Sequence, residues 1–197
     1  MKRILKNSLL IGAAVLGVSS VGIGSSVVKA ATTPPTTNVS ADITPGTITL
    51  DSEPAINFGT VASSASDTTY KSTAMTGDLH VTNPGEATGW SVSVADSPFT
   101  DTTSSNTLKG AVLSLDDSTT APLKADATDN VSALPTFNGA LTLSGTASNI
   151  LNAPAGAGIG AYTASYGNTD ASLMVPAGNA GGSYSSTLTW TLSNAPS

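Results

Sequence analysis

Cysteine is absent from this chain of 197 residues, so neither a disulfide nor a thiolate metal site contributes to its fold or chemistry. Arginine occurs only at position 3, histidine only at position 80, and glutamate only at positions 53 and 86. Long stretches of Leu, Glu and Lys at helical spacing are also missing, which gives helices little support. The remaining composition is rich in Thr, Ser, Val, Ala and Gly and favours strands joined by turns.

The first thirty residues have the pattern of an export signal. Lys2, Arg3 and Lys6 precede an apolar run of small and aliphatic residues, and Val28-Lys29-Ala30 matches the small-residue pattern of a cleavage site. The run is too rich in glycine and serine for a permanent membrane span of about 20 strongly apolar residues. We therefore expect a signal peptide over residues 1–30 and a secreted mature chain. No Leu-Pro-any-Thr-Gly sorting phrase follows, so we expect retention at a cell surface by binding rather than by an anchor.

Charge restricts the partners of the mature chain. Removing residues 1–30 leaves three lysines against thirteen carboxylates, a formal charge of −10. Nucleic acids and anionic lipid surfaces need Lys/Arg clusters, so the charge argues against both as partners, and also against teichoic acid as an electrostatic ligand. A neutral or zwitterionic polymer such as a glycan remains compatible with this charge.

Alternating apolar and polar residues predict an all-β domain. We expect a Thr/Pro-rich linker over residues 31–43 and a single Greek-key, Ig-like β-sandwich over residues 44–197. The polar segment 116–133 is predicted to be a long loop, and 152–160 a Gly/Ala/Pro loop. About nine strands are expected, at 47–50, 56–61, 78–82, 90–95, 108–115, 141–145, 161–166, 171–175 and 184–193.

The two tryptophans, Trp90 and Trp190, lie in similar short sequence motifs. Each is followed two residues later by an aliphatic residue, Val92 or Leu192, and residues two apart share one face of a strand. Such an apolar face suits the core of a sandwich. Aromatic rings also stack on sugars and anchor interfaces, so an accessible ligand-binding patch is the alternative. The pattern alone leaves both interpretations open.

Several segments taken together resemble the WxL-domain family, the wall-associated surface proteins of low-GC Gram-positive bacteria. The resemblance covers about residues 44–196, and its most specific part is the C-terminal phrase at 184–196. Weaker matches lie at 56–61, 79–83, 89–94 and 108–115.

This resemblance implies a non-catalytic protein that attaches non-covalently to peptidoglycan, with its ligand-binding motif region at Trp90, Val92, Trp190 and Leu192. It also implies association with membrane-anchored WxL-interacting proteins and larger WxL proteins, and it implies that the two motif strands are neighbours. A structural role in assembling a surface complex is the alternative function.

The chain departs from the family pattern at two places. Val92 stands where leucine is usual, and Asn83-Pro84-Gly85 replaces an Asp/Arg pair, which places ligand strength or partner choice in doubt.

No cofactor is indicated, and the remaining candidates for chemistry are few. His80 reads as a partly exposed residue of a strand, because acid–base catalysis would need an oriented partner that the sequence does not reveal. Six aspartates could supply calcium ligands, although no Asp-any-Asp-any-Asp-Gly register is present and solvated loop charges explain them as well. A paired-carboxylate glycosidase is poorly supported, because nine aromatics are spread over the domain. These aspartates are Asp96, Asp101, Asp116, Asp117, Asp126 and Asp129.

Overall fold

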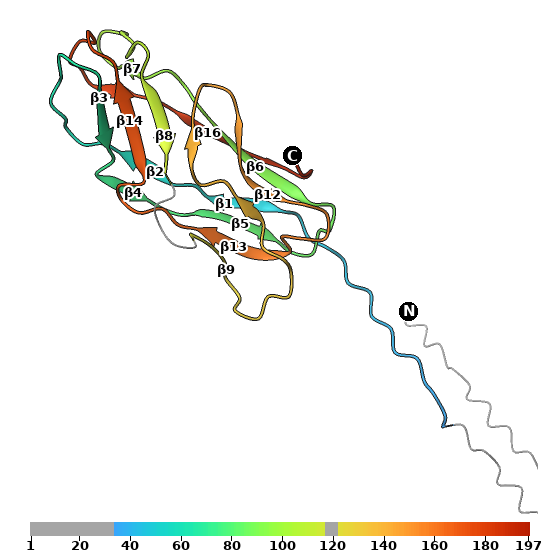
Figure 1. The fold of residues 1–197 in the computed structure, drawn as a ribbon. Helices are drawn as coiled ribbons and strands as arrows, with labels where there is room; N and C mark the ends of the chain where they lie inside the picture. The colour runs from blue at the N-terminus through green and yellow to red at the C-terminus, as the bar shows by residue number, and fades with distance from the viewer. Residues whose placement is uncertain (1–33, 117–121) are drawn as a thin grey trace, which may run out of the picture. The chain divides into compact units, whose positions relative to one another are not determined.

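The computed structural model describes residues 34–116 and 122–197. All regular structure in these two ranges is β: there are sixteen strands and no helix, in antiparallel sheets arranged as a sandwich (Figure 1). This confirms the expected fold class, with more strands than the nine predicted because several are only two or three residues long. The expected signal peptide lies outside the described residues.

The chain divides into residues 1–41 and residues 42–197. Residues 34–41 are exposed and carry no regular secondary structure. All strands belong to the second unit.

Three four-stranded sheets and two short ribbons make up the second unit. Sheet 1 has the order β1 (Thr49–Ser52), β5 (Leu79–Asn83), β13 (Gly160–Ala164), β9 (Leu123–Ala125). Sheet 2 has the order β10 (Thr136–Phe137), β12 (Ser148–Ala153), β6 (Trp90–Asp96), β16 (Leu188–Ser193). Sheet 3 has the order β11 (Leu141–Thr142), β8 (Val112–Leu115), β14 (Ala171–Val175), β3 (Thr68–Lys71). The ribbons pair β15 (Tyr184–Ser185) with β7 (Thr100–Asp101), and β2 (Ala55–Asn57) with β4 (Ala74–Thr76).

One hydrophobic core is shared by the three sheets. It forms because strands with period-two alternation direct every second side chain inward. Leu79 and Val81 of β5, Val92 and Val94 of β6, and Leu115 of β8 all belong to this single cluster and are almost completely buried. The same alternation leaves Thr and Ser on the outer faces, which explains the polar surface of a chain with few charges.

Strand β12 was not predicted, and its first two-thirds were assigned to no element. Ile150 and Leu151 are consecutive residues and both are fully buried. The register against β6 shifts between Asn149 and Leu151, so a bulge places two successive side chains in the core. Because a bulge interrupts the period-two pattern, alternation could not reveal the strand that lies beside β6 at the centre of sheet 2.

Two further predictions need correction at the level of elements. The loop predicted over 116–133 contains β9, and the loop predicted over 152–160 begins inside β12. The predicted strand 184–193 is interrupted between β15 and β16, where the Ser186 hydroxyl donates to the Ser97 carbonyl (2.7 Å) and the Thr187 amide to the Ser97 hydroxyl (2.9 Å). These bonds divert the chain from one short ribbon into the edge of sheet 2.

Candidate functional site

The two motif strands are neighbours, as the resemblance implied. β16 pairs antiparallel with β6, and Leu192 lies directly opposite Val92, while Trp190 lies opposite Val94. Residues directly opposite each other project from the same face of a sheet. The aliphatic residues of both motifs are therefore neighbours. Trp90 and Val94, the residue opposite Trp190, are four residues apart on β6, which corresponds to about 13 Å at the rise per residue of a strand. The two rings are not side by side.

Trp90 is fully buried, with 0% of its surface exposed. Its indole Nε1 donates to the carbonyl of Gly158 at 2.9 Å, and the Asn83 amide donates to the same carbonyl at 2.9 Å. Gly158 has a φ of +67°, and a Cβ there would lie 2.8 Å from the Trp90 Nε1 atom. Only glycine fits this close approach, so the 154–159 loop and the first motif lock together inside the domain.

Asn83 was identified only as a departure from the family pattern, and the structure gives it a role. It is fully buried, accepts a hydrogen bond from the Glu86 amide (2.8 Å) and donates to the Glu86 carbonyl (2.9 Å). Asn83 thus closes the Asn-Pro-Gly turn through its hydrogen bonds with Glu86, and its side chain also donates to the Gly158 carbonyl that accepts from Trp90. Sequence analysis missed this arrangement because Asn83 and Gly158 are distant in the chain.

Trp190 is half-buried, as are its face neighbours Leu188 and Leu192. All three pack against the core from the edge of sheet 2. Trp190 and Leu188 also line a groove of about 860 Å³. Of the four expected ligand-binding residues, Trp190 is therefore the one placed at a concave surface, while Trp90 and Val92 lie inside the domain.

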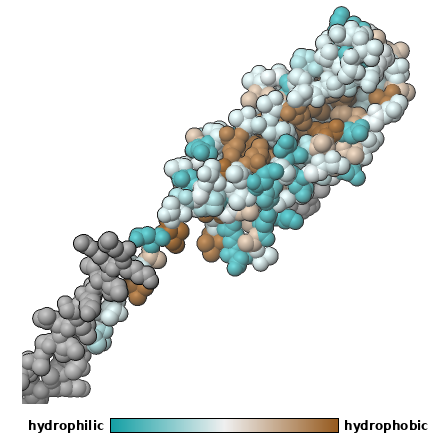
Figure 2. All heavy atoms as spheres, turned by 180° about the vertical axis from the view of Figure 1, so that it is seen from behind, coloured by the Kyte–Doolittle hydropathy of each residue, from teal (hydrophilic) through white to brown (hydrophobic). Residues whose placement is uncertain are grey.

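The groove is aromatic and nearly uncharged. Glu53 is the one charged residue among those that line it. Figure 2 shows apolar side chains reaching the surface between weakly polar and hydrophilic ones on the face opposite to that of Figure 1. Aromatic rings with mixed polar neighbours form a surface that binds ligands through stacking and apolar contact. Five of the nine aromatic residues of the chain line the groove: Phe58, Tyr70, Phe99, Tyr184 and Trp190.

Hydrogen bonds hold the loops around this groove. Tyr70 donates through its hydroxyl to the Ala62 carbonyl (2.7 Å), and Tyr184 donates to the Ala180 carbonyl (3.0 Å).

Asp101, beside the groove, accepts hydrogen bonds from the Ser104 amide (2.6 Å) and the Ser183 amide (2.7 Å). Hydrogen bonds from Ser104, and then from Thr103 and Ser183, lower the pKa of Asp101 to about 2. Asp101 is thus an ionised cap that fixes the loop before β15.

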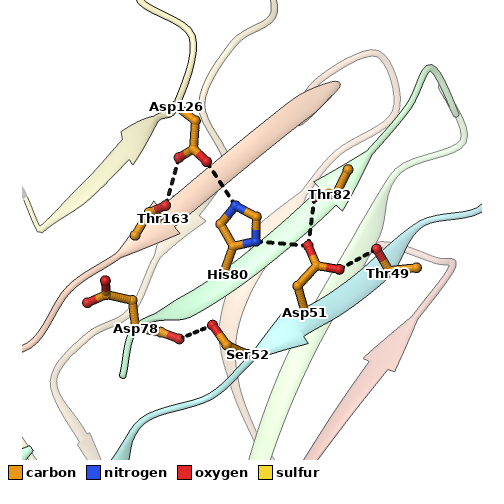
Figure 3. A network of polar contacts seen from close by, with 8 residues as sticks. All are labelled: Thr49, Asp51, Ser52, Asp78, His80, Thr82, Asp126 and Thr163. Atoms are coloured by element: carbon orange, nitrogen blue, oxygen red, sulfur yellow. Dashed lines mark hydrogen bonds and ion pairs between the residues drawn. The ribbon is translucent and has the colours of Figure 1, made fainter. Parts of the chain in front are cut away.

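A second polar cluster, which we call the His80 network, crosses the outer face of sheet 1 (Figure 3). Both ring nitrogens of His80 on β5 meet a carboxylate: Nδ1 lies 2.8 Å from Asp51 on β1, and Nε2 lies 2.8 Å from Asp126, directly after β9. Thr82 donates to Asp51 (2.6 Å) and Thr163 donates to Asp126 (2.7 Å). Side chains from or beside all four strands are therefore joined.

The charges in this network support one another. Burial alone would lower the pKa of His80, but hydrogen bonding and attraction from Asp126 and then Asp51 raise it above 6.5. For Asp51, burial acts to raise the pKa, and hydrogen bonds from Thr82, Thr49 and His80 together lower it. For Asp126, the hydrogen bond from Thr163 is the main cause of a lowered pKa. A protonated ring can donate to both carboxylates at once, which assigns His80 an ion-pairing role in a strand.

The other candidate aspartates have separate partners. Asp116 forms an ion pair with Lys71, and the Asp96 side chain accepts from the Gly145 amide at 2.7 Å. Asp129 is exposed, and Asp117 lies outside the described residues. Residues 34–116 and 122–197 contain no group of three or more His, Asp or Glu side chains arranged to hold a metal ion.

These features define a class: an all-β module with a nearly uncharged groove, lined by aromatic residues, beside its last strand. The family model described as "WxL domain surface cell wall-binding" matches residues 28–196. The chain belongs to this family, and its role is to bind the cell wall. Comparison with curated proteins found no match, and neither did comparison with solved structures. The described part of the chain holds no helix long and apolar enough to cross a membrane.

Proposed function

We propose that this protein binds the glycan strands of peptidoglycan non-covalently and without catalysis, through the groove that Trp190 lines. The observation that carries the proposal is the concentration of aromatic side chains there: Phe58, Tyr70, Phe99, Tyr184 and Trp190 surround a groove of about 860 Å³. Aromatic faces pack well on the C–H faces of sugar rings. A volume in this range suits a ligand of several rings.

The charge of the groove and of the chain favours a neutral stretch of the wall polymer as the ligand over an anionic one. Glu53 alone is charged among the lining residues, and the chain without residues 1–30 carries a formal charge of −10. An anionic polymer such as teichoic acid would be repelled by this field. The proposal treats residues 1–30 as an export signal, as their sequence implies, so that the mature domain reaches the wall.

Absence of catalysis is part of the same proposal. His80 has both ring nitrogens bonded to carboxylates, and it lies on sheet 1 and does not line the groove. Asp101 beside the groove has its oxygens occupied by hydrogen bonds from Ser104, Thr103 and Ser183. Acid–base chemistry on a glycosidic bond needs a pair of carboxyl groups facing the sugar, and Glu53 lines the groove without a second.

Co-sedimentation tests the proposal. The chain from residue 31 is mixed with peptidoglycan sacculi freed of protein and teichoic acid, and the pellet is analysed. We expect the protein in the pellet, released by soluble glycan fragments from muramidase digestion, with no new reducing ends formed. Protein that remains in the supernatant would contradict wall binding through peptidoglycan.

A second candidate function is assembly with other surface proteins, such as WxL-interacting proteins or larger WxL proteins. The observation that favours it is the half-buried apolar row of Leu188, Trp190 and Leu192 at a sheet edge, which a protein partner could cover. Sedimentation with walls that keep their proteins, but not with protein-free sacculi, would favour this second function over the first.

A further inference from the structure

The C-terminal strand β16 is an edge strand with one unpaired side. It pairs with β6 over its whole length, from Leu188 to Ser193, without a register shift. It is the last strand of sheet 2, and Figure 1 shows it running along the domain beside β6 toward the C-terminus. In the described part of the chain, no hydrogen bond from outside sheet 2 reaches the backbone of residues 188–193. The outward amides and carbonyls are therefore available to another strand.

The other edge strands of the three four-stranded sheets have features that hinder pairing with another strand, whereas β16 has none of these features. β1 contains Asp51 and a register shift, β9 has three residues with Lys124 at its centre, and β3 ends in Lys71. β10 and β11 have two residues each. Bulges, lysines and short length are the usual means by which sheets avoid edge-to-edge contact. By contrast, the six residues of β16 include no charge, no proline and no bulge.

The sequence of β16 is symmetric about Trp190. Leu188-Thr189-Trp190-Thr191-Leu192 reads the same in both directions, and the symmetry extends to Thr187 and Ser193, which both carry a hydroxyl. In an antiparallel pair related by a two-fold axis through residue 190, Leu188 faces Leu192 of the other copy and Thr189 faces Thr191. Every cross-strand pair then joins two apolar side chains or two hydroxyls, the combinations that stabilise antiparallel strands.

We propose that β16 pairs with β16 of a second copy of this chain, forming a two-fold dimer with one continuous eight-stranded sheet. The contact is isologous, so the same edge serves both copies and the assembly closes at two. On the apolar face it places Leu188 beside Leu192 and Trp190 beside Trp190 of the other copy, and it satisfies the outward backbone groups of both strands. No charged residue lies on the paired strands, so the remaining obstacle is the general repulsion of two acidic chains. Salt weakens that repulsion, and the dimer is therefore stronger at higher ionic strength.

Molar mass measured against protein concentration tests the pairing. We expect the mass of the mature chain to double as concentration rises, at lower concentration in 0.5 M than in 0.05 M salt. Thr189→Lys with Thr191→Lys places like charges opposite each other and prevents the doubling. Thr69→Lys with Thr76→Lys adds the same charge at exposed sites of β3 and β4 and is the matched control. A single-chain mass up to millimolar concentration, or equal loss of the dimer in both double variants, would overturn the proposal.

Cysteine pairs test the register directly, because the chain has no cysteine of its own. Residue 189 lies opposite residue 191 of the other copy, at a Cα separation of about 5 Å. Residue 189 lies more than about 7 Å from residue 189 of the other copy, too far for a disulfide. A mixture of Thr189→Cys and Thr191→Cys chains should therefore form a disulfide-linked heterodimer under mild oxidation, whereas each variant alone should not. Equal cross-linking within each single variant, or none in the mixture, would show that another surface or register is used.

Discussion

The two tryptophans have different environments although their sequence phrases match. Trp90 is buried and bonded to the Gly158 carbonyl, whereas Trp190 is half-buried at the groove. Alternation alone left both core burial and an accessible patch open for each side chain. Which of the two reaches a surface depends on the strand position, central for β6 and at the edge for β16, and strand order is not encoded in the pattern of one segment.

Trp90→Phe should destabilise the domain by about 1–3 kcal/mol, because it removes a buried hydrogen bond and part of a large buried ring. The Gly158 carbonyl keeps its bond from Asn83, which limits the loss. Urea unfolding followed by circular dichroism measures the change. Protein of this variant that is folded should sediment with sacculi as the unaltered chain does, since no part of the ring is exposed. Weak sedimentation of the folded variant would place ligand recognition at Trp90 instead.

At the scale of elements, the His80 network joins side chains across sheet 1, from β1 at one edge to Asp126 directly after β9 at the other. Sequence analysis anticipated a partly exposed histidine on a strand, and the structure places His80 there. It could not anticipate the partners, because Asp51 and Asp126 reach His80 only once β1, β5, β13 and β9 have assembled in that order. The same limit applies to β12, whose bulge hides its alternation.

The His80 network makes stability depend on pH. Because the pKa of His80 is raised on folding, its contribution is complete below about 6.5 and is lost as pH rises through the folded value. Because the pKa values of Asp51 and Asp126 are lowered, their contribution is present above 3.8 and is lost as pH falls through their folded values. The network therefore stabilises most between about pH 4 and 6.5.

Replacing His80 by Gln keeps a polar side chain and removes the titration. Urea unfolding at a series of pH values should show that the unaltered chain loses more stability between pH 6 and 9 than His80→Gln does. The imidazole proton resonances should titrate above 6.5 in the folded state. Parallel stability profiles for the two proteins would contradict an ion-pairing role of His80.

The whole molecule combines a strongly acidic surface with a groove that has a single charged lining residue, Glu53. Composition predicted the first of these features and argued against electrostatic attraction to anionic polymers. The groove could not be predicted, because its aromatics come from segments as distant as Phe58 and Tyr184, which only the folded chain brings together. The family match supplies the wall as the target, and our proposal places its binding in the groove.

The salt dependence of the affinity distinguishes binding by aromatic stacking from binding by charge–charge contacts. Ions screen charge–charge contacts but leave aromatic stacking and apolar contact largely intact. The affinity for sacculi should therefore change by less than about threefold between 0.05 and 0.5 M NaCl. A binding isotherm from sedimentation at each salt concentration measures this. A loss of affinity by orders of magnitude would indicate that charged groups of the wall, and not its neutral glycan, dominate binding.

The central claim is that the groove beside β16 holds the wall polymer, and one comparison of two variants tests it most directly. Trp190→Leu keeps an apolar side chain and removes the ring from the groove, whereas Tyr166→Leu removes a half-buried aromatic ring that does not line it. At matched folded fraction and low micromolar concentration, we predict that Trp190→Leu loses most of its sedimentation with protein-free sacculi and that Tyr166→Leu retains it. Equal binding by the two variants would contradict the account.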